Sequence, residues 1–234
     1  MSLNKKDEIY DLVVDGLINA RYRFGQRILV KELAADTGVS RQPIMTALGR
    51  LASDGFVRIV PQVGCQVVDP DRNAIADFYL MFQRMEGLLT ELAAERHTER
   101  ELRELVGLQK QIVRFEEGRG DVAQEYAGLN RSFHQVIHTM AHSPLLDEKQ
   151  RSNFNMSDFF INQTVGFGSF MTDAAKEHED IIEAIAGRST ARARHMAEAH
   201  INGIAAAVLS GIASPEAAAQ PGRPRSGLGA IASS

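Results

Sequence analysis

The sequence has one cysteine, Cys65, in 234 residues, so it cannot form an internal disulfide bond. This scarcity is typical of proteins that stay in a reducing compartment. No apolar run is long enough to cross a bilayer, and no secretory signal peptide is visible at the start of the chain. These absences exclude a disulfide-stabilised secreted domain, and they predict a cytoplasmic protein with no membrane partner.

The chain also lacks the basic excess that would indicate nucleic-acid binding, because its net charge is −4. The charge is nevertheless uneven: it is +1 over residues 1–70, −6 over 71–210 and +1 over 211–234. A weakly basic first third on an acidic body is compatible with a small DNA-binding module, although many chains divide in this way.

Hydrophobic residues make up 44% of the chain, which is enough for a sizeable core. We expect a first domain over 1–70, a second over 71–212 and a disordered tail over 213–234 rich in Pro, Gly, Ala and Ser. In the first domain the apolar periods predict helices over 7–20, 31–36 and 41–53, then strands over 56–60 and 65–68 joined as a hairpin. Gly38 can end the second helix, and Ser40 is suited to cap the third.

After Asp71 the strand signals end and helical periods continue to the tail. Expected helices lie near 73–96, 99–117, 121–141, 144–165, 173–187 and 190–211. Thr98 with Glu101 forms a capping box, Asp121 can cap the third of these helices, and Ser143-Pro144 can open the fourth. The predicted fold is therefore mainly α, with an N-terminal winged helix-turn-helix followed by an antiparallel bundle of about six helices.

The third helix of the first domain has the pattern of a recognition helix. Its apolar face consists of Ile44, Ala47, Leu48 and Leu51, which should leave Arg41, Gln42, Met45, Thr46 and Gly49 pointing outward. Arg41 and Gln42 stand at the end that reaches base edges, Lys31 suits a phosphate, and Gly64 at the hairpin lets backbone approach DNA. Spacing alone leaves open a helical subdomain with an exposed polar face.

Five runs within residues 9–68 carry a family pattern: Phe24-Gly25-Gln26-Arg27-Ile28, Lys31-Glu32-Leu33-Ala34, Gly38-Val39-Ser40-Arg41-Gln42-Pro43-Ile44, Ala47-Leu48-Gly49-Arg50-Leu51 and Asp54-Gly55-Phe56-Val57. In these runs the chain resembles the winged helix-turn-helix of the GntR family of bacterial regulators. The resemblance implies a double-stranded DNA operator, bound by a homodimer. The family usually has Arg in place of Met45, often Glu in place of Thr46, and Arg or His in place of Val63, which implies an atypical operator or weaker binding.

All seven histidines follow residue 96. Asn130 and His134 are spaced i, i+4 and share a helix face, while His178 and His200 belong to two later helices. If these helices pack around a common centre, the four side chains can converge on a transition metal. Separate surface or structural histidines are the alternative, and His138 and His142 compete as ligands because they continue the His134 face.

Further runs match a helical effector domain: Met85-Glu86-Gly87, Leu92-Ala93-Ala94-Glu95-Arg96, Asn130-x-x-Phe133-His134, Ser143-Pro144-Leu145-Leu146, Glu177-His178-x-x-Ile181 and His200-Ile201. Residues 72–210 thus resemble the FCD domain of the FadR subfamily of GntR regulators. Metal-binding members present Asp and three His at the positions of Asn130, His134, His178 and His200. The resemblance implies a divalent metal, Zn or Ni, that the neutral Asn130 holds less tightly and that favours an anionic effector.

Phe82 stands at a position where the FCD family often has an effector-binding arginine. Arg84 stands two residues further, which rotates it by about 200° around a helix, so it is a weak candidate for the effector contact. It could equally pair with a neighbouring acid. Phe82 suggests a pocket for a less charged ligand.

The sequence thus predicts a ligand-responsive transcriptional regulator whose affinity for DNA changes with a small effector, with a hinge near Val68 to Arg72. A regulator for which the metal itself is the signal is the alternative. A metal-dependent enzyme is less favoured, because Glu177 and Glu179 flank His178 on its helix and are expected to point away from it.

Overall fold

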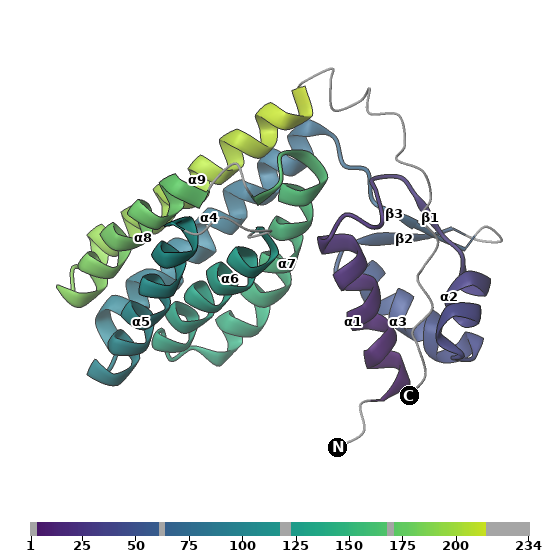
Figure 1. The fold of residues 1–234 in the computed structure, drawn as a ribbon, viewed down its shortest axis with the longest axis horizontal. Coiled ribbons are helices and arrows are strands. Elements are labelled where there is room, and N and C mark those ends of the chain that lie inside the picture. The colour runs from purple at the N-terminus through teal and green to yellow at the C-terminus, as the bar shows by residue number, and fades with distance from the viewer. Residues whose placement is uncertain (1–3, 61–63, 118–122, 168–170, 214–234) are drawn as a thin grey trace.

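The computed structural model describes residues 4–60, 64–117, 123–167 and 171–213. Within these ranges the chain forms a small N-terminal head and a helical bundle that lie side by side (Figure 1). The elements of the head, in chain order, are α1 (Lys5–Ile18), β1 (Arg27–Ile28), α2 (Val30–Thr37), α3 (Arg41–Ser53), β2 (Val57–Val60) and β3 (Gly64–Val67). The described residues include no helix long and apolar enough to cross a membrane.

The helix-turn-helix of the head forms as predicted. Gly38 ends α2 in the left-handed region, at φ 66°, and its N–H donates to the Ala34 carbonyl. Ser40 occupies the N-cap of α3, but its side chain makes no capping hydrogen bond, so that detail of the prediction was wrong. The apolar face of α3 is buried in the core of the head through Ile44, Ala47, Leu48 and Leu51.

The sheet of the head has the strand order β1-β3-β2, with both pairs antiparallel. The predicted hairpin is β2 and β3, in which Val57 pairs with Val67 and Val60 with Gly64. The structure adds β1, which pairs Arg27 with Gln66 and Ile28 with Cys65. Two residues are too short to produce a strand period, so the sequence predicts no strand there. Residues 61–63 at the tip, including Val63, lie outside the described ranges.

The bundle consists of α4 (Arg72–Arg96), α5 (Glu99–Glu117), α6 (Ala123–Met140), α7 (Pro144–Thr164), α8 (Met171–Ala186) and α9 (Thr190–Ala213). The predicted helices agree with these bounds within about two residues. The capping box at the start of α5 is confirmed, since the Thr98 N–H donates to Glu101 Oε2 at 2.8 Å and the Glu101 N–H to Thr98 Oγ1 at 3.3 Å. Asp121, the expected cap of α6, lies outside the described ranges.

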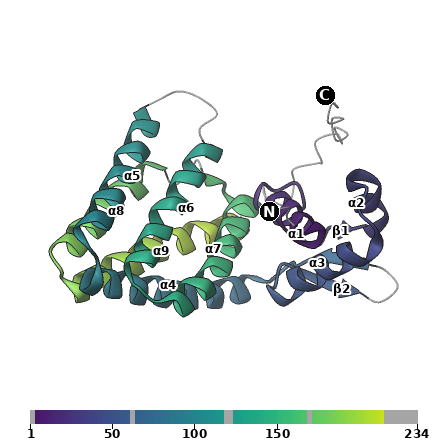
Figure 2. The same cartoon turned by 90° about the horizontal axis from the view of Figure 1, so that it is seen from below.

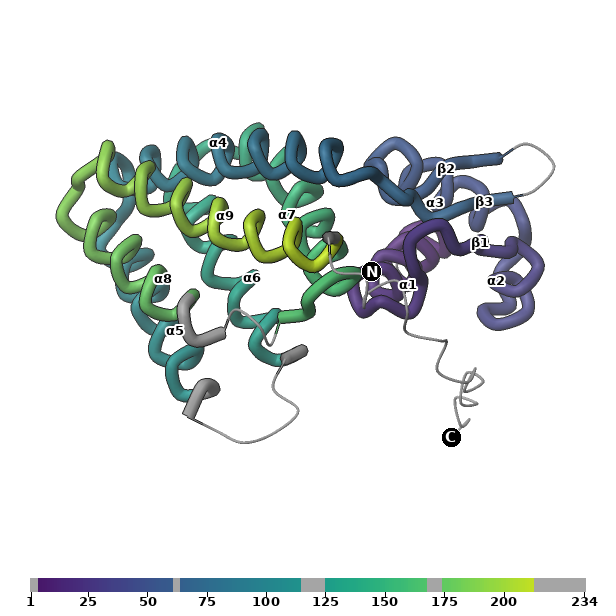
Figure 3. The backbone as a smooth tube through the Cα atoms, turned by 90° about the horizontal axis from the view of Figure 1, so that it is seen from above, coloured from purple at the N-terminus to yellow at the C-terminus, as the bar shows by residue number. Residues whose placement is uncertain are grey.

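Helices α4 and α9 run side by side along one face of the bundle (Figures 2 and 3). Ala213, which the sequence placed in the tail, is the last residue of α9, and residues 214–234 lie outside the described ranges. Ser143 stands at the N-cap of α7 with Pro144 at the first helical position, although the Ser143 side chain makes no capping bond.

Helix α7 joins the bundle to the head. The Phe159 ring packs edge-on against Phe24 at a centroid distance of 5.2 Å and against Phe56 at 5.9 Å. One turn further, Gln163 accepts the Phe24 N–H at 3.2 Å and donates to the Tyr22 carbonyl at 2.9 Å. The predicted hinge at Val68 to Arg72 is therefore accompanied by a second, side-chain connection between the two domains.

Candidate functional sites

The exposed side of α3 carries most of the predicted DNA contacts. Arg41, Gln42 and Thr46 are exposed, as is Lys31 at the start of α2. Met45 differs from the expectation, because it is half-buried and packs against the core of the head. Gly64 is partly exposed and adopts φ 114°, a conformation that glycine tolerates and other residues rarely adopt. The polar end of α3 is thus free to meet a ligand, while Met45 is less available.

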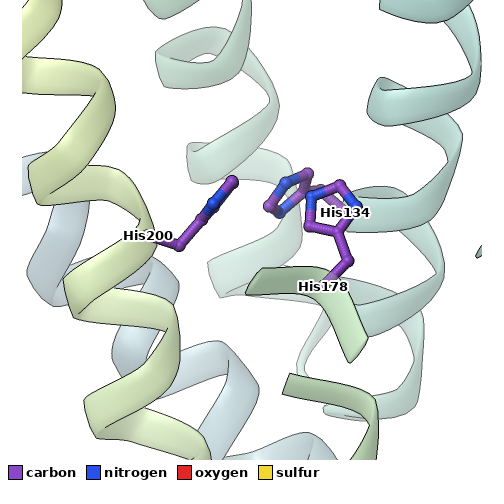
Figure 4. A group of neighbouring side chains, drawn as sticks. All are labelled: His134, His178 and His200. Atoms are coloured by element: carbon purple, nitrogen blue, oxygen red, sulfur yellow. The ribbon is translucent and has the colours of Figure 1, made fainter. Parts of the chain in front are cut away.

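The structure brings His134, His178 and His200 together from α6, α8 and α9 (Figure 4). One ligand nitrogen from each ring can be chosen so that all three lie within 4.8 Å of one another. The three residues are almost fully buried, with exposed fractions of 2%, 0% and 1%. Three different helices therefore present one imidazole each to a single enclosed point.

The free nitrogens of these rings fit a metal ion. His134 Nε2, His200 Nε2 and both nitrogens of His178 are buried and have no hydrogen-bond partner among the described residues. A buried polar atom without a partner costs free energy, and such groups usually indicate a missing ligand, ion or water. Zn²⁺ and Ni²⁺ are commonly bound by imidazole nitrogen. The donor set therefore suits the metal predicted from the sequence.

Two carboxylates orient the outer nitrogens of this cluster. Glu86 Oε2 accepts from His134 Nδ1 at 3.0 Å, and Glu177 Oε2 accepts from His200 Nδ1 at 2.6 Å. Both contacts leave Nε2 facing the common centre, which is the arrangement in which carboxylates usually support metal-binding histidines. Glu177 points away from His178, as expected, but it reaches His200 on the neighbouring helix, a contact that the sequence did not predict.

Glu86 is a functional candidate that the sequence reasoning missed. It is 1% exposed, and besides His134 it accepts from His138 Nε2 at 2.6 Å and from Gln150 Nε2 at 2.7 Å. Burial alone would raise the pKa of Glu86, but the nearby His138 and the hydrogen bonds from His134 and His138 outweigh it and hold that pKa well below its usual range. Glu86 is therefore ionised inside the bundle.

Two rings at the centre, those of His134 and His178, are held in the form that binds metals. Burial lowers the pKa of His134, although Glu86 opposes the change. Burial, followed by the nearby His200 and His134, lowers the pKa of His178 well below its ordinary value. Neutral imidazole is the state that donates an electron pair to a metal, so these shifts favour coordination near neutral pH.

The remaining predicted site residues divide into two groups. Asn130 is buried on α6, one turn before His134, on the same side of that helix. Phe82 is buried and stacks on Phe78 at a centroid distance of 5.6 Å, whereas the Arg84 side chain is 64% exposed and donates to Glu198 at 2.7 Å. Arg84 is thus paired with an acid on the outer surface and is not brought to the histidine centre.

Four other histidines do not join the three-ring cluster. His138 is buried on Glu86, and His97 is buried at the C-cap of α4 with Nδ1 2.9 Å from the Ala93 carbonyl. His142 is 47% exposed and lies 3.4 Å from Glu101, and His195 is exposed on α9. The competition that the sequence left open between His134, His138 and His142 is thereby resolved in favour of His134 as the member of the cluster.

Comparisons with known proteins agree with this architecture. Residues 77–203 match the family model described as FCD domain, and residues 5–67 match bacterial regulatory proteins of the gntR family. YdhC of Bacillus subtilis, an uncharacterized HTH-type transcriptional regulator, is 25% identical over 200 residues, which are 83% of this chain and 87% of that protein. The HTH-type transcriptional regulator McbR of Escherichia coli is 28% identical over 124 residues, 53% of this chain and 55% of its own length.

Solved structures show the same fold. E. coli McbR/YncC superimposes with a TM-score of 0.75 at 19% identity, covering 89% of this chain and 98% of that one. A putative transcriptional regulator GntR from Rhodococcus sp. RHA1 gives a TM-score of 0.70 at 18% identity, covering 88% and 97%. At such identities the likeness establishes the arrangement of the head and the bundle, and it carries no information on the ligand.

Proposed function

Since the chain belongs to the GntR family of bacterial regulatory proteins and carries an FCD domain, we propose that it binds a DNA operator as a homodimer, with an affinity set by a small organic acid and a bound metal. It is a transcriptional regulator and not an enzyme. The observation that carries the DNA-binding part is the exposed polar end of α3, where Arg41 and Gln42 stand on a helix whose other face is buried. Those side-chain types read guanine and adenine edges.

The metal part of the proposal rests on the unpaired nitrogens of His134, His178 and His200. A divalent ion bound there would supply positive charge and would link α6, α8 and α9, with Asn130 as a neutral oxygen donor from the same face of α6. Glu86 and Glu177 would hold two of the rings in the required tautomer. The protein residues themselves fix the rings, exclude water by burial and keep the imidazoles of His134 and His178 neutral.

The outer face of α4 supports the homodimer. Leu80, Met81 and Leu88 on this helix are large apolar residues with exposed fractions of 55%, 46% and 40%. With Asp77 and Arg84 they follow the seven-residue spacing of a helix–helix contact. If two copies of α4 meet antiparallel about a two-fold axis between residues 80 and 81, each Leu80 faces Met81 and each Asp77 faces Arg84 of the second copy. In this arrangement the apolar residues of the two copies meet one another and the opposite charges pair.

A regulator that responds to the metal itself remains the second candidate, because the three imidazoles are nearly inaccessible to a larger ligand. Titrating Zn²⁺ or Ni²⁺ without organic acid, while following DNA affinity, separates the two. A change of affinity with metal alone favours the second candidate, and a change that needs an added acid favours the first.

The proposed function is tested by selecting genomic fragments on the purified full-length protein. We expect enrichment of a palindromic sequence whose affinity falls steeply as salt rises, since phosphate contacts release counterions. Enrichment should be lost in Arg41→Ala. If no sequence is enriched by a folded, dimeric protein, the proposal is wrong.

A further inference from the structure

A cleft of about 650 Å³ opens on the side of the bundle formed by α5, α6 and α7. We call this space the α5–α7 cleft. Its lining includes Gly107, Leu108, Arg131, Gln135, Val136 and Arg151. Its volume is in the range of sites for small organic ligands.

The α5–α7 cleft lies on a different side of α6 from the histidine centre. Arg131 and Gln135 each follow Asn130 and His134 by one position, which turns them by about 100° around the helix axis. None of the three clustered histidines is among the residues that line the cleft. The cleft is therefore distinct from the candidate metal site.

The polar end of the cleft continues inward to a buried histidine. A small cavity of about 30 Å³ shares Arg131, Gln135 and Arg151 with the cleft and ends at His138 and Phe154. The His138 side chain is 2% exposed, and its Nδ1 has no hydrogen-bond partner among the described residues, since Asp147 Oδ1 is 3.8 Å away. Two polar atoms thus lie buried and unpaired at this end, His138 Nδ1 and Arg131 Nε.

The charges around the polar end favour an anion. Two guanidinium groups line the cleft, and among its described lining residues Glu104 is the one carboxylate. Arg131 uses one terminal nitrogen on Asp158, which leaves its Nε unpaired. Arg151 is 64% exposed and forms an ion pair with Asp147 at 3.6 Å, which is longer than a hydrogen bond. Both side chains therefore keep donors available, and the fork of an arginine matches a carboxylate.

The opposite wall is apolar and open. Leu108 and Val136 face the cleft, and Gly107 stands in the interior of α5, where glycine weakens a helix. A Cβ built on Gly107 would meet no described atom within 4 Å, so close packing does not demand glycine there. Its effect in this structure is to leave the cleft wide.

We infer that the α5–α7 cleft binds a small carboxylic acid with an apolar body. The carboxylate lies between Arg131 and Arg151 at the end nearest His138, and the body lies along Leu108 and Val136. This assignment locates the effector of the proposed regulator and rests on that proposal for its biological meaning, but the binding itself does not depend on DNA.

An acid in this position would be linked both to the histidine centre and to the contact between the bundle and the head. His138 is joined to the metal centre through Glu86, at 2.6 Å and then 3.0 Å to His134. On the other side, Arg131 also lines a second cleft of about 410 Å³ with Tyr10 and Asp15 of α1. An anion on Arg131 would therefore change the charge at the contact between the bundle and the head.

The test is calorimetric titration of full-length protein with benzoate and hexanoate, and with benzamide as the uncharged counterpart of benzoate, before and after metal removal with a chelator. We expect at least one acid to bind with and without metal, and benzamide to fail. Arg151→Gln should weaken binding about tenfold, the usual effect of losing a charged hydrogen bond. Gly107→Leu should abolish it by filling the cleft.

Arg100→Gln is the matched control, because Arg100 is an exposed arginine of α5 that does not line the cleft. Circular dichroism would check that each variant is folded. Binding that is lost on metal removal but unaffected by Gly107→Leu would place the acid at the histidines and overturn the inference, as would the absence of binding by either acid. A protein that binds acid in the cleft but enriches no DNA would contradict the proposed function and leave this inference standing.

Discussion

Glu177 Oε2 lies 2.6 Å from His200 Nδ1, although the two residues are 23 positions apart and belong to different helices. The contact fixes the ring so that Nε2 faces His134 and His178. We predict that Glu177→Ala weakens Zn²⁺ binding by roughly 10–100-fold, because the ring loses both its orientation and a basic partner. Competition with a chromophoric chelator measures this. Glu179→Ala, which removes an exposed acid two residues away, should leave the affinity unchanged, and an equal loss in both variants would refute a specific role for Glu177.

A bound metal should stabilise the folded protein. With Zn²⁺ at 100 times its dissociation constant, linkage gives about 2.7 kcal/mol, or roughly 5–10 °C in melting temperature for a chain of this size. His178→Ala should remove this increment, since both nitrogens of His178 lack another partner among the described residues. Differential scanning calorimetry with and without Zn²⁺ gives the increment for each variant. His142→Ala is the control, and a zinc increment that persists in His178→Ala would argue against the centre.

The local sequence was sufficient to predict helices whose ends are set by their own residues. The ranges 31–36 and 99–117 agree with α2 and α5 to within one residue because Gly38 and the Thr98–Glu101 box act within one turn of the helix ends. Helix α1 ends at Ile18 instead of residue 20, where Ala20 takes a positive φ of 52° and the Arg21 N–H returns to the Gly16 carbonyl. Strand β1 depends on pairing with β3 and has no local signal.

The candidate site was predictable only in part. Family resemblance identified the three clustered histidines. The sequence places Glu177 beside His178 on the same helix, whereas its hydrogen-bond partner is His200, which the packing of α9 on α8 brings close. Glu86 had a signal that was not used: an acid on the apolar stripe of α4 formed by Tyr79, Phe82 and Leu89. A charge on such a stripe needs buried partners, and the structure supplies them.

Asp158 on α7 provides a pH prediction. Burial raises its pKa to about 6, against the opposing effect of Arg131. Between about pH 4 and pH 6 the Asp158 carboxyl is therefore ionised in the unfolded chain but still protonated in the folded protein. As pH rises over this range, the contribution of Asp158 to the free energy of unfolding falls by about 3 kcal/mol. Chemical denaturation should show that Asp158→Asn gains stability relative to wild type between pH 4 and pH 6. A constant difference across this range would show that the folded carboxyl is not perturbed.

The face of α4 gives a prediction for assembly. Sedimentation should show a wild-type dimer, and Leu80→Glu should shift it towards monomer because a charge would be buried against Met81 of the second copy. Asp77→Arg and Arg84→Asp should each weaken the dimer by placing like charges opposite one another, and the double reversal should restore it when Glu198, the partner of Arg84 in its own chain, is also changed to Gln. Leu145→Glu is the control, because Leu145 is 79% exposed and outside α4. No recovery in the variant with all three changes would contradict the two-fold pairing.

Arg41 and Lys31 should contribute differently to DNA binding. Arg41 stands at the N-terminus of α3, where it can reach a base edge, so Arg41→Ala should cost about 1–3 kcal/mol and relax the preference at one base pair of each half-site. Lys31, exposed at the start of α2, suits a phosphate. Lys31→Ala should weaken binding to all sequences alike and reduce the slope of log affinity against log salt by about 1 per contact.

Fluorescence anisotropy with the selected operator and a scrambled fragment, at several salt concentrations, separates these two effects. Met45→Arg extends the comparison, because Met45 is half-buried and an arginine there must leave the core of the head to reach a base. We expect Met45→Arg to increase affinity for scrambled DNA through its added charge, with a smaller change for the selected operator. If Arg41→Ala lowers both affinities equally, Arg41 contacts phosphate, and base reading must lie with Gln42 and Thr46.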